Sequence, residues 1–279
     1  MIFDNQACSL GEGLLWHPLR NSLFWFDINN KRMYERRFLD DHAQLFEFDE
    51  HVSAAGWVDQ NTLLIASETA LFYFSIESKK RLDIVDLEAQ NNETRSNDGR
   101  ADPYGGFWIG TMGKNAETGY GAIYRYYKGE LRRLYADITI PNSICFSPNG
   151  RTAYYCDTPV RKIMQQTLDN EGWPLGSPEI YIDVTPYSPD GSVVDSEGNL
   201  WNAQWGANRV ACYNPAGDYV KSVTFTASQI SCPAFGGDEM THLFASSARE
   251  NLISPHDDDG KVFITSTDII GQKEHQVIL

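Results

Sequence analysis

The feature that most constrains the fold is a sequence pattern that recurs six times along the 279-residue chain. Each copy has a short polar start, an apolar strand, a turn that carries Asn, Asp or Gly, and a second apolar strand with an aromatic residue. The copies begin at Glu12, Ala55, Asp98, Asn142, Asp190 and Pro233. Their spacings of 43, 43, 44, 48 and 43 residues lie within the range of about 40–50 residues that is typical of four-stranded propeller blades.

The rest of the chain also favours strands. Segments such as "SLFWFDI", "TLLIASE" and "GFWIGTM" are short, rich in aromatic and β-branched residues, and bounded by turn residues. No long segment has a convincing amphipathic helical period, and the nearest approach, "SIESKKRLDIVDLEAQNN", also reads as strand–turn–strand. The fold class is therefore predicted to be all-β.

We predict a six-bladed β-propeller that occupies residues 1–279 as a single domain, because six repeats fill the chain and each leaves room for two further strands. In the first repeat these strands are "RMYERRF" and "AQLFEFD". A pair of β-sandwiches is the alternative, but it does not require so even a period. We expect either "MIFDNQA" or the tail "EHQVIL" to supply the outer strand of the last blade, since this would remove an exposed sheet edge.

Composition limits the partners of the protein. A formal charge of −15 argues against nucleic acid, because phosphate binding needs a basic face. No apolar window is long enough for a membrane span and no secretory signal is visible. The five cysteines are scattered, which favours reduced, mostly buried thiols in a cytoplasmic protein. We expect a monomer or a weak homo-oligomer that acts on a small molecule.

The starts of the repeats suggest a metal site. Equivalent positions on the innermost strands would form a ring at one mouth of the central channel, and there Glu12, Asp98 and Asp190 contribute carboxylates and Asn142 an amide oxygen. Carboxylates crowded together repel one another and are costly to desolvate. A divalent cation removes this cost, because such oxygens are suited to Ca²⁺, Mg²⁺ or Mn²⁺. Any one of these residues could instead cap a turn.

Several motifs extend this reading to a known family. The segments "SLGEGLLWHP", "RSNDGRADPYGGFWIGTM", "PNSICFSPNGRTAYYCDT" and "PDGSVVDSEGNLWNAQWGANRV" resemble the gluconolactonase/regucalcin family of sugar lactonases. The resemblance touches all six repeats. It implies a six-bladed propeller with one divalent metal at the channel mouth, Ca²⁺ first and Zn²⁺, Mn²⁺ or Mg²⁺ as alternatives, and hydrolysis of an aldono- or aldarolactone.

The same resemblance implies roles for individual residues. The Glu of "GEG", the Asn of "PNS" and the Asp of "PDG" are the implied metal ligands, which are Glu12, Asn142 and Asp190. The pair in "RSNDG", Arg95 and Asn97, is the implied substrate-binding pair.

Three further positions are less direct matches to the family. Asp98 would contact the metal through water or support the ligands from behind. Lys114 and Glu117 stand in "GKNAETGYGAIY", where animal members carry a longer acidic insertion, and they are candidate substrate contacts.

These residues suggest a mechanism in which the metal polarises the lactone carbonyl and Asp190 acts as general base. Rival schemes lack their motifs: there is no G-x-S-x-G elbow, no H-E-x-x-H zinc pattern and no dinucleotide-binding fingerprint. Two alternatives stay open. One is a non-catalytic propeller that binds calcium or a protein, and the other is an esterase or phosphotriesterase that uses the same site.

Overall fold

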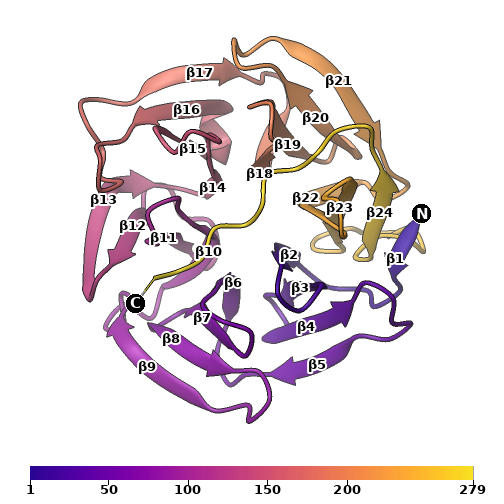
Figure 1. The fold of residues 1–279 in the computed structure, drawn as a ribbon, viewed down its shortest axis with the longest axis horizontal. Helices are drawn as coiled ribbons and strands as arrows, with labels where there is room; N and C mark the ends of the chain where they lie inside the picture. The colour runs from indigo at the N-terminus through magenta and orange to yellow at the C-terminus, as the bar shows by residue number, and fades with distance from the viewer. Residues whose placement is uncertain (279) are drawn as a thin grey trace.

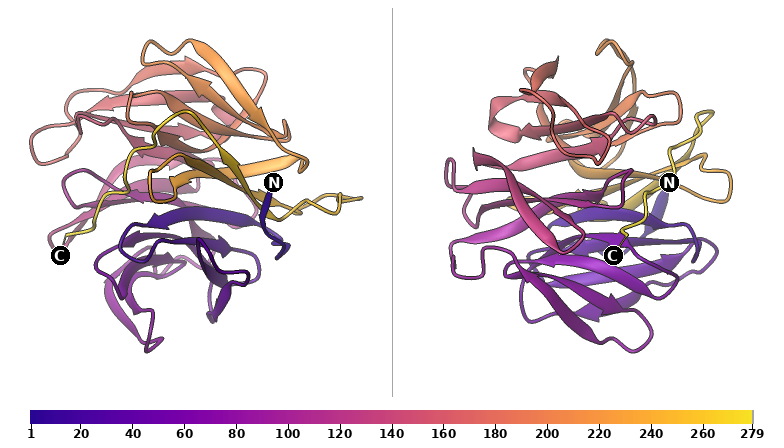
Figure 2. Two further views of the ribbon diagram at one scale, coloured as in Figure 1. Left: turned by 45° about the vertical axis from the view of Figure 1, so that its right-hand side comes forward. Right: turned by 60° about the vertical axis from the view of Figure 1, so that its left-hand side comes forward.

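The computed structural model describes residues 1–278 and consists of six four-stranded antiparallel sheets arranged in a ring (Figure 1). Figure 2 shows the same ring from two further directions. The sheets are the blades of the predicted β-propeller, and the all-β fold is confirmed. The β-sandwich alternative is therefore wrong.

Five blades are continuous in sequence and run from the inner to the outer strand. They are β2 (Gly11–His17), β3 (Ser22–Asp27), β4 (Arg32–Arg37) and β5 (Gln44–Glu47); β6 (Val52–Trp57), β7 (Thr62–Ser67), β8 (Ala70–Ser75) and β9 (Arg81–Asp86); β10 (Thr94–Ala101), β11 (Phe107–Gly113), β12 (Gly121–Tyr127) and β13 (Glu130–Ile138); β14 (Pro141–Phe146), β15 (Thr152–Asp157), β16 (Lys162–Thr167) and β17 (Glu179–Asp183); and β18 (Ser188–Val194), β19 (Leu200–Trp205), β20 (Arg209–Tyr213) and β21 (Tyr219–Thr224). A single 3₁₀ turn, η1 (Thr158–Val160), interrupts the fourth blade within the part of the chain described.

The N-terminus closes the ring. The last blade contains β22 (Gln229–Gly236), β23 (His242–Ala248) and β24 (Val262–Ser266), and its outer strand is β1 (Ile2–Asp4). Strand β1 pairs antiparallel with β24, so the first of the two expected closing segments is confirmed. The seam joins strands from both ends of the chain and covers the edge of β24.

The C-terminal tail has a different position. After β24 it crosses the ring towards the second and third blades (Figure 1). The amide of Gly271 donates to the carbonyl of Met240, that of Val277 to Trp57, and that of Ile278 to Gly105. The amide of Ser196 in the fifth blade also donates to the carbonyl of Ile270, so the tail contacts four blades and adds an outer strand to none of them.

Every inner strand has the same local irregularity. In each blade the inner strand has one residue more than the stretch of the next strand that it faces, as where Glu12 pairs with Phe26 and Leu15 with Phe24. The same bulge begins at Val52, Ser96, Asn142, Pro189 and Ile230. Bulges bend a strand and redirect its side chains. All six bulges lie near the start of the inner strand, and therefore at the same end of the channel.

This register corrects the repeat alignment made from sequence. Glu12 and Asn142 do occupy equivalent positions, but Asp190 lies one residue and Asp98 two residues beyond that position. The prediction that the six repeat starts form one ring of equivalent residues is therefore wrong. The oxygen-bearing side chains instead come from three successive positions within the bulged segments.

The core lies between the blades and is aromatic. Trp25, Trp108 and Trp201, each on the second strand of its blade, are fully buried, and side chains of this size contribute large buried areas. All five cysteines are buried and free, as expected. Among residues 1–278, no helix is long and apolar enough to cross a membrane.

The seam can be tested with Phe3. Its ring packs edge-on against Phe244 at 5.0 Å, with the guanidinium of Arg36 4.4 Å from its centroid. We expect Phe3→Ala to lower the free energy of unfolding by about 3 kcal/mol, through the cavity it leaves, in urea denaturation. The exposed Met1→Ala is the control. Equal stability of the two variants would contradict closure by β1.

Candidate metal and substrate site

One mouth of the channel opens into a cavity of about 550 Å³. Its walls come from the starts of inner strands and from residues at or after the ends of second strands. They include Leu10, Glu12, Arg95, Asn97, Met112, Lys114, Asn115, Ala116, Ile140, Asn142, Thr158, Asp190, Trp205, Glu250 and Asn251. Most of the residues predicted from sequence therefore line one cavity.

Three carboxyl groups are buried at the floor of this mouth. Burial raises the pKa of Glu12 to about 8, and Asp98 adds to the shift by repulsion. Burial raises the pKa of Asp190 well above its usual value, and the charges of Glu12 and Asp98 raise it further. Of the leading influences on Asp190, only the amide of Gly191 lowers this pKa. The floor thus buries carboxyl groups whose ionised forms are compensated only slightly by nearby donors.

Asp98 lies deeper and is better supported. Its Oδ2 accepts a hydrogen bond of 2.8 Å from the amide of Ile144 on the next blade. Burial raises its pKa to about 6, while that amide and Arg100 oppose the shift. It does not line the cavity, so it lies behind Glu12 and Asp190.

The amide of Asn142 is held in one orientation. Its Nδ2 donates to Oγ1 of Thr158 at 2.9 Å, and Thr158 donates in turn to the carbonyl of Pro189 at 2.8 Å. Its Oδ1 accepts from Nδ2 of Asn97 at 3.0 Å and keeps a second lone pair. Because the nitrogen is engaged, the oxygen is the end of the amide that can contact a cation.

Arg95 and Asn97 form a buried pair beside Asn142. Nη1 of Arg95 donates to Oδ1 of Asn97 at 2.9 Å, and Asn97 also donates to the carbonyl of Pro141 at 2.9 Å. Both amide hydrogens of Asn97 are therefore already used. Burial lowers the pKa of Arg95, opposed by nearby carboxylates of which Glu250 is the strongest. Within this pair, Arg95 has the donors that remain available to a ligand.

The backbone at the bulges brings two blades close together. Gly13 has φ +59°, and a Cβ there would collide with the carbonyl of Ser53 on the next blade. Ser143 holds a positive φ of 61° although it is not glycine, a conformation that costs free energy. Its hydroxyl donates to the carbonyl of Asp190 at 2.6 Å. The strained position links the strand of Asn142 to that of Asp190.

Lys114 and Glu117 lie apart. Nζ of Lys114 is 3.1 Å from Oε2 of Glu68, which also accepts from His51, and Lys114 lines the cavity. The carboxylate of Glu117 accepts from the amide and side chain of Asn115 at 3.0 and 2.8 Å and does not line the cavity. The structure therefore groups Lys114, but not Glu117, with the other predicted residues.

Several lining residues were missed from sequence. Met112, Thr158, Trp205 and Glu250 all lie at or just beyond the end of the second strand of a blade. The repeat pattern could have identified these positions, since the second strand of each blade ends at the mouth where the inner strand begins. Applying the same period to that position would have selected them.

The donor set fits a hard cation. Within the described residues no three His, Cys, Asp or Glu side chains group closely enough to hold a metal alone, so a cation here would need an additional ligand such as the amide oxygen of Asn142. Buried carboxylates that repel each other, beside a fixed amide oxygen, suit an oxygen-coordinated divalent ion.

Almost the whole chain is similar in sequence to known proteins. Residues 10–249 match the family described as the SMP-30/Gluconolactonase/LRE-like region. A protein of Rhizobium meliloti named "Putative sugar lactone lactonase" is 37% identical over 97% of this chain and 94% of its own. The L-arabinolactonase of Azospirillum brasilense is 33% identical over 93% and 89%.

A solved structure agrees closely in fold. The calcium-binding protein regucalcin from Agrobacterium tumefaciens superposes with a TM-score of 0.96 at 36% identity, covering 100% of this chain and 97% of the other. The sequence match and the agreement of the backbones thus cover all six repeats. The chain belongs to the SMP-30/gluconolactonase/LRE-like family.

Proposed function

We propose that this protein hydrolyses a sugar lactone with the help of one divalent cation. The names of its relatives, a sugar lactone lactonase and an L-arabinolactonase, support lactone hydrolysis. The observation that carries the proposal is the single cavity that two buried carboxylates, a fixed amide oxygen and a guanidinium group line together. An activated ester needs a proton acceptor and an anchor for its hydroxyl groups, and these groups supply both.

Glu12, Asn142 and Asp190 would hold the cation, with Ca²⁺ as the first choice and Zn²⁺, Mn²⁺ or Mg²⁺ as alternatives. When bound, it supplies Lewis acidity towards the lactone carbonyl oxygen. The repulsion between Glu12 and Asp190 is the physical reason for binding, because a positive ion between them replaces an unfavourable interaction with two favourable ones.

The protein's own groups perform the proton transfers. Asp190 accepts the proton of the water that attacks the carbonyl carbon, because its buried carboxylate lines the cavity. The ring C–O bond then breaks, and the leaving alkoxide takes up a proton to give the free sugar acid. Asp190 is the nearest acid in this scheme that can return it.

Arg95 anchors the substrate. Its free N–H groups can bind sugar hydroxyls or a terminal carboxylate, while Asn97 keeps the guanidinium in place. A protein that only binds calcium would gain nothing from a buried guanidinium in its cavity. This residue therefore favours the enzyme over the non-catalytic alternative, and Lys114 at the rim adds a second positive group.

We expect Asp190→Asn to lower kcat by roughly 10²–10⁴-fold, the usual contribution of a general base, and EDTA to abolish activity until Ca²⁺ or Mn²⁺ is restored. Acid release from five- and six-carbon aldonolactones measures both effects. Asp41→Asn, on an exposed loop, is the control and should behave as wild type. If the EDTA-treated wild type and Asp190→Asn both turned over at the untreated rate, the mechanism would be wrong.

The metal-free protein should lose stability as the pH rises. The pKa of Glu12 is about 8 in the fold, against about 4.3 in an unfolded chain, so the folded state holds this proton more tightly. Its stabilising contribution is complete below the unfolded pKa and is lost as the pH rises through about 8.

The measurement is the thermal midpoint of EDTA-treated protein between about pH 5 and pH 8. It should fall more steeply for wild type than for Glu12→Gln, which has no proton to lose, and added Ca²⁺ should flatten the wild-type curve. Parallel curves for the two proteins would falsify the assigned electrostatics.

A further inference from the structure

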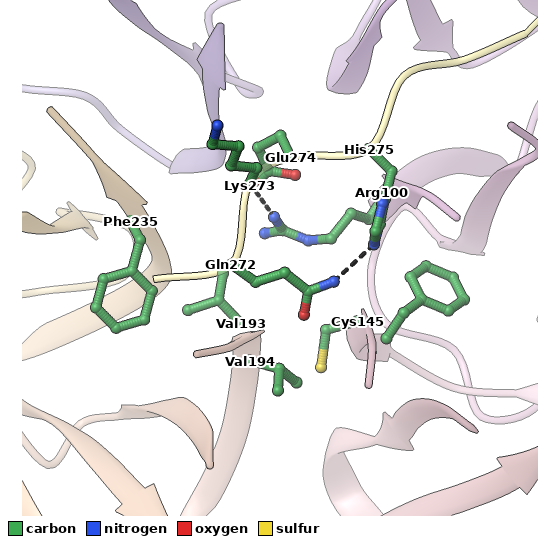
Figure 3. A pocket seen from close by; sticks show the side chains of 10 residues that line it. Arg100, Cys145, Val193, Val194, Phe235, Gln272, Lys273, Glu274 and His275 are labelled. Carbon is green, nitrogen blue, oxygen red and sulfur yellow. Dashed lines mark hydrogen bonds and ion pairs between the residues drawn. The ribbon is translucent and has the colours of Figure 1, made fainter. Parts of the chain in front are cut away.

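The far end of the channel holds a charged pair that lies outside the proposed reaction. Figure 3 shows Glu274 of the C-terminal tail facing Arg100, with Gln272 hydrogen-bonded to His275 beside them. Arg100 Nη1 and Glu274 Oε1 form a salt bridge, and the two side chains are 10% and 7% exposed. Buried ion pairs are costly to desolvate, so this one calls for an explanation.

The tail is fixed where Glu274 meets the channel. The indole Nε1 of Trp57 donates to the carbonyl of Glu274 at 3.0 Å, and Nε2 of Gln276 donates to the carbonyl of Val58 at 2.6 Å. The amide of Val277 donates to the carbonyl of Trp57 at 2.9 Å. These bonds, made at Glu274 and just after it, fix the tail where the Glu274 carboxylate meets Arg100.

Arg100 connects this end to the candidate site. It lies two residues after Asp98 on β10, a spacing that places side chains on the same side of a strand. Arg100 lowers the pKa of Asp98 and Glu274 raises it, so both charges act on the group behind Glu12 and Asp190. The channel thus carries charged side chains of both signs from one mouth to the other.

The channel carries more carboxyl groups than guanidinium groups, and this excess suits a cation. The carboxylates are Glu12, Asp98, Asp190 and Glu274, and the guanidinium groups are Arg95 and Arg100. Without Glu274, Arg100 would be a buried cation whose nearest partner is Asp98, and it would compete with the metal.

We propose that Glu274 and Arg100 are positioning residues for the cation at the opposite mouth: the tail carboxylate engages Arg100 and so keeps the site's carboxylates available to the ion. The inference rests on the proposed cation site and assigns the C-terminal tail a part in its affinity. It requires no contact between the tail and the substrate.

The test is the dissociation constant for Ca²⁺, measured by titration calorimetry on the full chain. Glu274→Gln keeps the shape of the side chain and removes its charge, and it should weaken binding roughly tenfold. Glu274→Asp keeps the charge and should bind more tightly than Glu274→Gln. Lys273→Gln, an exposed neighbour on the same tail, is the matched control and should leave the affinity unchanged.

A double variant separates charge from packing. Arg100→Gln combined with Glu274→Gln removes both charges of the buried pair and should restore most of the affinity lost in Glu274→Gln. If the tail acts only by packing, the double variant will bind no better than the single one. That result, or wild-type affinity in Glu274→Gln, overturns the proposal.

The wild-type titration keeps the two proposals distinguishable. If the wild type binds no Ca²⁺, Mn²⁺ or Zn²⁺, the cation site of the proposed function fails, and the positioning role fails with it. If the wild type binds and all tail variants match it, only the positioning role fails.

Discussion

The fold buries carboxyl groups that repel one another at one mouth of its channel. This repulsion is the constraint on which the account of the site depends. Neighbouring blades pack closely around the starts of the inner strands, so the carboxylates placed there are largely desolvated. Glu12 and Asp190 meet there, and burial together with nearby charge holds their pKa values far above the ordinary range. Beside these carboxyl groups Asn142 is fixed in orientation, and one lone pair of its amide oxygen stays available. That combination is costly in an empty site and favourable around a cation.

The surrounding structure keeps these groups in place. Bulges at one level of all six inner strands redirect side chains towards the mouth. The positive φ of Ser143 and the close approach at Gly13 hold neighbouring blades in register there. At the seam, β1 completes the last blade, so both ends of the chain serve the ring. The N-terminus closes it at the edge, and the tail brings Glu274 to the channel.

The sequence was sufficient for the fold class, the number of blades and most of the predicted residues that line the candidate cavity, because strand patterns and turn residues repeat visibly. It was insufficient for the register. A one-residue bulge does not disturb the alternation of short aromatic strands, so Asp190 and Asp98 were aligned with Glu12 although they lie one and two residues further on. The path of the tail was equally hidden, since "EHQVIL" was a candidate outer strand and its observed place depends on contacts with Trp57. Glu117 was selected by sequence position alone, and its carboxylate turns back to Asn115.

The most direct test of the account is a crystal structure of the protein grown with Ca²⁺ or Mn²⁺, with anomalous data to locate the ion. The account predicts one peak at the cavity floor, within about 2.0–2.6 Å of oxygens from Glu12, Asn142 and Asp190. A cavity that stays free of metal at millimolar concentrations, or an ion bound elsewhere in the channel, would contradict it.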